Sequence, residues 1–249
     1  MDTSEFNGKV AVVTGAARGI GKAVADALAK SGATVAAVDI AFASEGKNQF
    51  MVDVVDSAAV NKTISAVEHQ LGEIDYLVNV AGILRMGSLL ECSDDDWQRT
   101  FAVNTTGAFN LCRAVGRRML LRKRGAIVVV SSNAASIPRI GMGAYAASKA
   151  ATSHMLKCLG LELAQANIRC NIVAPGSTDT DMQRQLWVDA SGAEKVIAGS
   201  LENYRLGIPL QRIATPENIA SVVLFLLSSN AAHITLESIL VDGGATLGC

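Results

Sequence analysis

Tyr145 and Lys149 stand four residues apart in a run of small residues, and Ser132 lies thirteen residues before the tyrosine. On a helix, residues i and i+4 share one face, so the phenol and the ammonium can point at one spot. A free phenol is a poor base, because its pKa is about 10. A neighbouring cation favours the phenolate, so the spacing predicts that Lys149 lowers the pKa of Tyr145 and makes it a proton acceptor.

Two adjacent serines, Ser131 and Ser132, follow the apolar run Ala126–Val130, which predicts a buried strand. A serine hydroxyl at a strand end can donate a hydrogen bond that stabilises a developing alkoxide or carbonyl. Side chains alternate between the faces of a sheet. We therefore expect only one of the two serines to reach the tyrosine, and the other to face the opposite side of the sheet.

A glycine-rich turn near the N-terminus predicts a nucleotide site. The apolar run Lys9–Val13 leads into the turn Thr14–Gly21, which is followed by an alanine-rich helical stretch and a second apolar run, Ala33–Val38. This order of strand, turn, helix and strand places a pyrophosphate at a helix N-terminus, where free amides and the helix dipole attract it. The spacing is Gly-x-x-x-Gly-x-Gly, which differs from the more familiar Gly-x-Gly-x-x-Gly.

Asp39 follows the second apolar run, where a carboxylate can accept hydrogen bonds from an adenosine ribose diol. The same carboxylate would repel a 2′-phosphate, and Ile40 beside it adds no positive charge. Arg18 in the glycine turn is the one basic residue that favours a phosphorylated cofactor. We therefore expect NAD rather than NADP, with a simple cap of the strand end as the alternative role of Asp39.

These motifs, in this order, resemble those of the short-chain dehydrogenase/reductase family over nearly the whole chain. The residues that carry the resemblance are Thr14–Gly21, Asn79-Val80-Ala81-Gly82, Asn104, Ser132, Tyr145, Lys149 and Pro175–Thr180. Val80 departs from the family, which usually has a second asparagine there. The thirteen-residue distance to Tyr145 matches the family serine to Ser132 rather than to Ser131, so the resemblance implies that Ser132 reaches the tyrosine and that Ser131 faces the other side of the sheet.

The resemblance also implies roles that the residue types alone leave open. Lys149 is expected to hold the nicotinamide ribose, and Asn104 to anchor a water that links Lys149 to bulk solvent. Without the resemblance, Asn104 has the character of an ordinary mid-helix polar residue. The expected NAD site consists of Gly15, Arg18, Gly19, Ile20, Gly21, Asp39, Asp53, Val54, Asn79, Ala81, Gly82, Tyr145, Lys149, Pro175, Gly176, Thr178 and Thr180.

Three further segments, Ala81–Gly87, Pro138–Met142 and Gly176–Gln183, resemble a subfamily of these enzymes. That subfamily oxidises 2,3-dihydro-2,3-dihydroxybenzoate, a carboxylated cyclic diol, to 2,3-dihydroxybenzoate with NAD in siderophore biosynthesis. The alternatives are another short-chain alcohol dehydrogenase, a 3-ketoacyl reductase or, remotely, a non-catalytic nucleotide-binding scaffold.

A carboxylated substrate calls for a guanidinium and an apolar wall. Arg85 and Arg139 lie in loops that are expected to line the site, and either can bind a carboxylate through two hydrogen bonds. Met86 and Met182 are expected to contact the ring, and Ser132 its hydroxyl. The alternative is that both arginines are solvated surface charges.

The elements that must position these residues alternate along the chain. Short apolar runs alternate with helical stretches, and half of the residues are hydrophobic. This pattern predicts an α/β fold with one Rossmann-type, doubly wound parallel sheet of about seven strands and helices on both faces. Residues 1–249 are expected to form a single domain. Within it, the irregular segment of about residues 181–206 is expected to cover the substrate as a lid, or else to be a plain pair of surface helices.

Two long helices are expected. One begins with a capping box of Ser93 and Asp96 and runs to about Met119, and the other spans about Ala144–Gln165. The acidic run Asp94–Asp96 then lies at a helix N-terminus, where the dipole favours it, rather than at a metal. In the family these two helices pack between subunits, so the resemblance implies a homotetramer.

Composition excludes several classes of partner and site. The formal net charge is −1, which argues against binding to nucleic acid or to a charged membrane surface. Five dispersed cysteines and three isolated histidines predict neither a disulfide framework nor a metal site, and instead indicate reduced, buried thiols. The N-terminus has no apolar stretch, and no apolar run is long enough to span a bilayer, so we expect a cytoplasmic protein.

Overall fold

The computed structural model describes residues 4–249 and contains one seven-stranded sheet in the order β3-β2-β1-β4-β5-β6-β7. Every neighbouring pair of strands is parallel. The strands are β1 (Val10–Thr14), β2 (Thr34–Asp39), β3 (Gln49–Met51), β4 (Ile74–Asn79), β5 (Gly125–Val130), β6 (Ile168–Pro175) and β7 (Ser238–Val241). The predicted Rossmann-type fold, with about seven strands, is confirmed.

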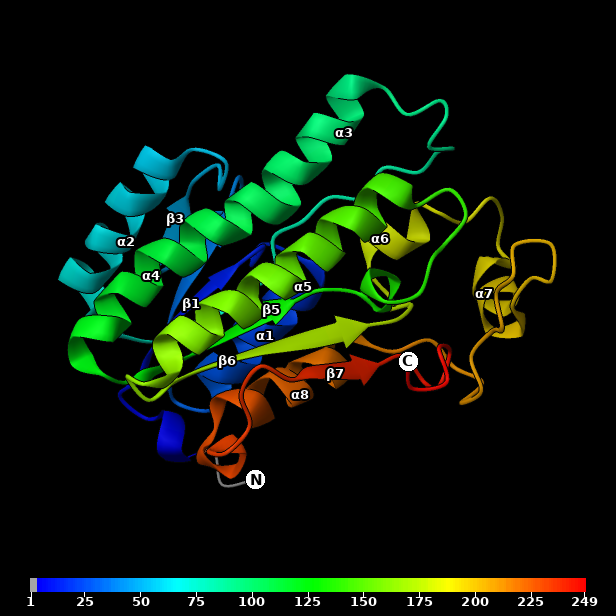
Figure 1. Cartoon of the computed structure of the whole chain (residues 1–249). Coiled ribbons are helices and arrows are strands. Elements are labelled where there is room, and N and C mark those ends of the chain that lie inside the picture. Colours follow the sequence, from blue (N-terminus) through cyan, green and yellow to red (C-terminus); the bar gives the residue numbers. More distant parts are fainter. Residues whose placement is uncertain (1–3) are drawn as a thin grey trace.

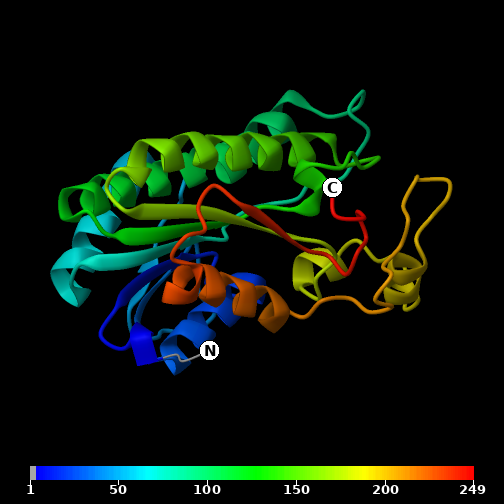
Figure 2. The same cartoon turned by 60° about the horizontal axis from the view of Figure 1, so that its bottom comes forward.

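Helices cover both faces of this sheet, as the three layers in Figure 2 show. One layer consists of α1 (Gly19–Lys30) and α8 (Pro216–Leu227), and the other of α2 (Ser57–Leu71), α4 (Ala108–Arg122) and α5 (Gly143–Ala164). Consecutive residues of a strand enter opposite layers, so Val12 and Val13 belong to separate buried clusters. Burial on both faces explains why the strands are continuous apolar runs without alternation.

The first predicted long helix is continuous but not uniform. It comprises α3 (Asp94–Phe101), a π-helical segment (Ala102–Gly107) and α4. The three aspartates lie in its first turn, as predicted, and the Ser93 hydroxyl accepts a hydrogen bond from the Asp96 amide at 3.1 Å. The expected capping box is only half formed within residues 4–249, because the Asp96 carboxylate lies 3.6 Å from Arg85 instead.

The segment of residues 181–206 projects beyond one edge of the sheet, next to the C-terminal turn (Figure 1). It holds two short helices, α6 (Asp181–Arg184) and α7 (Gly192–Ala198), and its covering of the substrate stays a prediction. The Leu210 amide donates to the Gly243 carbonyl at 3.1 Å and fixes the end of the segment to the turn after β7.

The cysteines match their expected state only in part. All five cysteines are free, and burial raises the pKa of Cys170 to about 12. Cys158 and Cys249 are exposed, so the expectation of buried thiols is wrong for these two. Between residues 4 and 249, no helix has the length and apolar character needed to cross a membrane, and no cluster of acidic, histidine and cysteine side chains is suited to a metal ion.

Candidate active site

The predicted functional residues gather at the carboxyl edge of the sheet. The strand order reverses between β1 and β4, and ligands of open parallel sheets bind beside such a reversal. The glycine turn follows β1, Asn79 ends β4, Ser132 follows β5, and Gly176 follows β6. Because all of these strands run parallel, four segments that are distant in sequence meet at this one edge.

Ser132, Tyr145 and Lys149 form a compact group where β5 meets α5. Helix α5 begins at Gly143, so Tyr145 and Lys149 occupy its first two turns. All three side chains are buried, and the Ser132 hydroxyl accepts a hydrogen bond from the Ala134 amide at 3.1 Å. The Lys149 ammonium lies 5.8 Å from the centre of the Tyr145 ring and donates to the Val130 carbonyl at 3.0 Å.

Burial, rather than Lys149, dominates the acidity of the tyrosine in this structure. It raises the pKa of Tyr145, and the hydrogen bond from Ser132 opposes the rise. Burial also lowers the pKa of Lys149 to about 8. Burial therefore opposes the predicted effect of Lys149, and the lowering of the pKa of Tyr145 by Lys149 stays a prediction.

Ser131 does not face away from the catalytic helix, as we had expected, but toward it. Its hydroxyl lies 2.7 Å from that of Ser153 and donates to the Lys149 carbonyl at 3.2 Å. The two serines therefore serve the same helix at different turns. Ser132 leaves the strand and reaches Tyr145, whereas Ser131 supports the backbone one turn further along.

We expect Ser132→Ala to lower kcat about 100-fold, because the alanine removes a donor aimed at the reacting oxygen. Ser131→Ala should leave kcat within about threefold and reduce the free energy of unfolding by about 1 kcal/mol through lost hydrogen bonds. Steady-state kinetics and urea unfolding of both variants test this assignment. A larger loss of kcat in Ser131→Ala than in Ser132→Ala would reverse the two roles.

Asn104 is a buried bridge and not an ordinary mid-helix polar residue. It lies in the π-helical segment, where its side chain pairs with both backbone groups of Ile83, at 2.8 and 3.0 Å. Its amide nitrogen also donates to the Ser148 hydroxyl at 2.9 Å. The loop after β4 is thereby tied to α5 beside Lys149. Such local helix irregularities often occur at functional sites.

Thr14 joins the nucleotide turn to the neighbouring strand, a role that the sequence did not reveal. Its hydroxyl donates to the Asn79 side chain at 3.1 Å and accepts from the amides of Val80 and Ala81 at 3.0 and 3.1 Å. Asn79 is therefore an organiser of this turn. A hydroxyl residue at a strand end, directly before the first glycine, is the signal that could have pointed to it.

The glycine turn has the geometry that a pyrophosphate requires. A Cβ atom at Gly21 would lie 2.0 Å from the Gly15 carbonyl oxygen, so only glycine lets α1 begin this close to the strand. Gly19 has a positive φ of 55°. The first amides of α1, at residues 19–21, have no partner within the helix.

Asp39 does more than cap its strand. One carboxylate oxygen accepts from the amide of Ala17 in the glycine turn at 2.9 Å, and the other from the Ile40 amide at 2.7 Å. Each oxygen keeps a further lone pair, which suits the two hydroxyls of a ribose. Arg18 is exposed at the start of α1, so both charges that bear on cofactor choice lie at the glycine turn.

The residues expected to bind the two ends of the dinucleotide differ in which of their groups are free to contact a ligand. The Asp53 carboxylate accepts a hydrogen bond from the Val55 amide at 3.0 Å and lies 3.6 Å from the Arg99 guanidinium. The side chain of Val54 is buried and packs near Gly107. Val54 can therefore offer a ligand only its backbone.

At the other end, Thr178 is buried and donates to the Gly176 carbonyl at 3.2 Å. Thr180 caps α6, and its methyl group lies close to Gly19. The turn after β6 is thus in contact with the glycine turn, and Gly176 itself packs against Asp242. One dinucleotide can touch all of these segments, so the residues present fit the expected cofactor.

The structure separates the two arginines that were expected to bind a carboxylate. Arg85 is mostly exposed and forms an ion pair with Asp96. Arg139 is partly buried and has no ion pair within residues 4–249. Met86, one of the two expected ring contacts, is exposed near Gly141. Of these two arginines, only Arg139 has a guanidinium without an ion pair among residues 4–249, so it is the one that is free for a ligand.

Comparisons with known proteins agree with this arrangement. A family model described as enoyl-(acyl carrier protein) reductase matches residues 15–246. A 2,3-dihydro-2,3-dihydroxybenzoate dehydrogenase of Bacillus subtilis (strain 168) is 53% identical, and the alignment covers 100% of each chain. An enzyme of the same name from Escherichia coli (strain K12) is 50% identical over 98% of this chain and 99% of its own.

Among solved structures, the ligand-free aldohexose dehydrogenase of Thermoplasma acidophilum is similar, with a TM-score of 0.89. It is 33% identical and the alignment covers 99% of this chain and 97% of that one. These matches extend over the glycine turn, the catalytic group and the segment that follows β6, so the likeness is not confined to the nucleotide-binding half.

Proposed function

Since the chain belongs to the short-chain dehydrogenase/reductase family, we propose that it oxidises 2,3-dihydro-2,3-dihydroxybenzoate to 2,3-dihydroxybenzoate with NAD. The position of buried Ser132, Tyr145 and Lys149 where β5 meets α5 carries this proposal, because it brings a donor, a proton acceptor and a cation to one place. The full-length relatives with this activity in their names support the choice of substrate.

The proposed reaction uses each member of the group at one atom. The Tyr145 oxygen accepts the proton of the reacting hydroxyl, and the Ser132 hydroxyl donates to the same substrate oxygen as it becomes a carbonyl. When bound, the dinucleotide supplies the hydride acceptor. The ketone formed on the ring tautomerises to an aromatic catechol, which draws the reaction toward oxidation.

Asp39 favours NAD over NADP in this proposal. Its carboxylate is fixed by two backbone amides and faces the position of the adenosine ribose, where a 2′-phosphate would be repelled. The expected holders of the dinucleotide are the amides that begin α1, Asp39, Asp53, Lys149 and Thr178. Asn104 is proposed to anchor, through its position beside Lys149, a water that relays protons to solvent.

An assay that follows the absorbance of the reduced cofactor as it forms tests the proposed function directly. The protein is mixed with NAD or NADP and with the carboxylated dihydrodiol, a neutral dihydrodiol or a 3-oxoacyl thioester. We expect the highest kcat/KM for the carboxylated dihydrodiol with NAD, and at least about tenfold less with NADP. Preference for the thioester would favour the alternative of a reductase, and no turnover of any alcohol or ketone would favour a binding scaffold.

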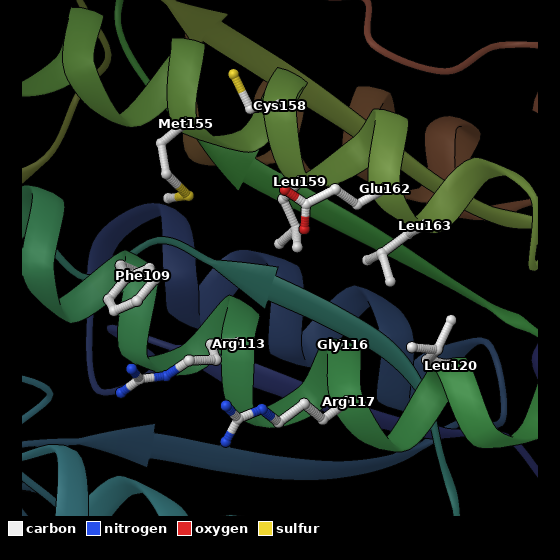
Figure 3. Close-up of a pocket in the computed structure, with 10 residues that line it drawn as sticks. All are labelled: Phe109, Arg113, Gly116, Arg117, Leu120, Met155, Cys158, Leu159, Glu162 and Leu163. Atoms are coloured by element: carbon white, nitrogen blue, oxygen red, sulfur yellow. The ribbon is translucent and has the colours of Figure 1, made fainter.

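We further propose that the protein is a homotetramer, with the face of α4 and α5 as one interface. These helices border a groove of about 400 Å³, which none of the catalytic residues lines. Figure 3 shows Phe109 and Arg113 on α4 opposite Met155 and Leu159 on α5. The groove is lined by arginines on α4 and by Glu162 on α5. In a two-fold dimer the arginines of one copy can face Glu162 of the other, so the charges on this face are complementary to themselves. Light scattering should give a mass near four times 26.0 kDa.

The whole chain is taken as one catalytic domain in the cytoplasm, in which the segment of about residues 181–206 covers the substrate. Met182 on α6 and Met86 after β4 would contact the ring from this segment and from the neighbouring loop. Partners other than a small carboxylated cyclic diol, such as nucleic acid, are not expected at a net charge of −1.

A further inference from the structure

Asp242 is a buried carboxylate without a counter-ion. Among residues 4–249, Asp75 and Asp242 are the only buried aspartates, with exposed fractions of 8% and 9%. Asp75 lies 3.5 Å from the Lys9 ammonium, whereas no lysine or arginine of this part of the chain forms an ion pair with Asp242. Burial of a charge without a counter-ion is costly, so the place of Asp242 in the fold calls for an explanation.

Hydrogen bonds from distant segments stabilise this carboxylate. One oxygen accepts from the Thr246 hydroxyl at 2.7 Å and from the Asn133 side chain at 3.3 Å, and the other accepts from the Gly244 amide at 2.9 Å. Burial raises the pKa of Asp242, but the three hydrogen bonds outweigh it and hold the pKa below its ordinary value. Asp242 is therefore an anion at neutral pH, and it joins the turn after β7 to Asn133.

Asn133 connects Asp242 to the catalytic serine. It is buried, it follows Ser132 directly, and it begins a short 3₁₀ helix, Asn133–Ala135. The Ala134 amide in this helix donates to the Ser132 hydroxyl at 3.1 Å. That bond occupies one lone pair of the hydroxyl and leaves its proton free to be donated. The position of this serine turn therefore sets the position of the Ser132 hydroxyl.

Asp242 also packs against the turn after β6. A Cβ atom at Gly176 would lie 2.6 Å from the Asp242 Cβ atom and 3.3 Å from the side-chain nitrogen of Asn133, so only glycine allows this approach. The Gly176 amide donates to the Val241 carbonyl at 3.0 Å, and the Thr178 hydroxyl donates to the Gly176 carbonyl at 3.2 Å. Asp242 thus contacts both the serine turn and the turn that begins at Gly176.

We propose that Asp242 is a positioning residue, which holds the serine turn and the Gly176 turn at a fixed separation. The inference rests on the proposed function, in which Ser132 binds the reacting oxygen and the Gly176 turn holds the nicotinamide end of the dinucleotide. The rate of hydride transfer depends on how these two are placed, and a displacement of about 1 Å can lower a rate about 100-fold. Asp242 touches neither the substrate nor the dinucleotide and acts only through the two turns.

Binding of two nucleotides tests the link to the Gly176 turn without turnover. NADH carries the nicotinamide, whereas ADP-ribose lacks it and keeps the pyrophosphate and the adenosine. Asp242→Ala keeps the Cβ atom that Gly176 packs against and removes both oxygens that accept hydrogen bonds. Calorimetry should show that the variant binds NADH about tenfold more weakly than wild type does, and ADP-ribose within about twofold, because the glycine turn and Asp39 are unchanged.

Asp75→Ala is the matched control for this experiment. Asp75 lies near the amino end of β4, away from the site, and its carboxylate accepts from the Val10 amide at 3.1 Å. Both variants lose buried hydrogen bonds and should unfold at lower urea concentration than wild type. Asp75→Ala should keep the parental kcat and the parental affinity for both nucleotides, whereas Asp242→Ala should lower kcat for the dihydrodiol about 100-fold.

Two further variants separate the parts of the link. Asn133→Leu breaks only the bond to the serine turn, so it should lower kcat about tenfold and leave NADH binding within about twofold. An unchanged kcat in Asn133→Leu would show that the serine turn does not depend on Asp242. Asp242→Asn keeps the shape of the side chain and an acceptor for the Gly244 amide. If Asp242→Ala does not fold, Asp242→Asn decides, and its loss of NADH affinity should exceed its loss of ADP-ribose affinity at least about threefold.

Equal losses of affinity for NADH and ADP-ribose in Asp242→Ala, or no loss of either, would overturn the inference. The same selective loss in Asp75→Ala would overturn it too, because any buried aspartate would then have this effect. If wild type fails to oxidise the dihydrodiol but Asp242→Ala selectively loses NADH, the proposed reaction is wrong and the positioning role stands. If wild type oxidises the dihydrodiol and Asp242→Ala binds NADH as wild type does, the reaction stands and the positioning role is wrong.

Discussion

Replacing Tyr145 with phenylalanine should lower kcat for diol oxidation by about 1,000-fold or more. The variant loses one oxygen, which is the proposed proton acceptor and the partner of Ser132, and keeps the buried ring. General base catalysis contributes about 10² to 10⁴ to a rate, and the hydrogen bond that orients the substrate is lost as well. Initial rates at saturating NAD and dihydrodiol measure the effect.

The control for this experiment is a tyrosine outside the site. Tyr204 is exposed in the segment that follows α7, and Tyr204→Phe should retain the parental kcat. The affinity of Tyr145→Phe for NAD, measured by quenching of protein fluorescence, should stay within about threefold, because the glycine turn is untouched. A Tyr145→Phe enzyme that turns over at the parental rate would refute the proposed chemistry.

Lys149→Met should lower kcat/KM by about 100- to 1,000-fold at pH 7.5 and should also move the pH profile upward. In wild type, kcat/KM for oxidation should rise with pH to an inflection near 8, the lowered pKa of Lys149. Above this pH the Tyr145 phenol and the Lys149 amine share a single proton. In the active arrangement that proton lies on Lys149, so that Tyr145 is a phenolate and Lys149 an ammonium.

The direction of the shift follows from burial. Without Lys149 the phenol must lose its proton alone, and burial holds the pKa of Tyr145 above its ordinary value of 10. The inflection of Lys149→Met should therefore lie at least one unit above that of wild type. Lys157→Met, two turns further along α5, serves as the control. An unchanged inflection in Lys149→Met would show that the lysine does not take part in the titration.

The local pattern of residues determined the elements and their order. Apolar runs of four to eight residues between turn residues are enough to mark strands that are buried on both faces. Ser93 and the acidic run Asp94–Asp96 likewise marked a helix start correctly, because caps depend on neighbours in sequence. The spacing of Tyr145 and Lys149 on one helix face belongs to the same class of local information.

Contacts between distant segments decided the rest. The residue types left both Arg85 and Arg139 open as carboxylate ligands, with only the resemblance favouring Arg139, and the structure adds an ion pair of Arg85 with Asp96 on α3. The sequence placed Ser131 on the wrong face and did not reveal that burial raises the pKa of Tyr145, because both depend on how α5 packs against β5. Asn104 acquired its bridge only when a π-helical segment met the loop after β4.

The chain itself therefore determined which chemical groups are present, in which elements they lie and at which edge of the sheet they meet. Only the tertiary structure decided which charges are neutralised, which side chains lose water and which guanidinium groups stay free. The physical reason is that desolvation and ion pairing depend on atoms contributed by remote segments, whereas helix periodicity and capping depend on neighbours within a few residues.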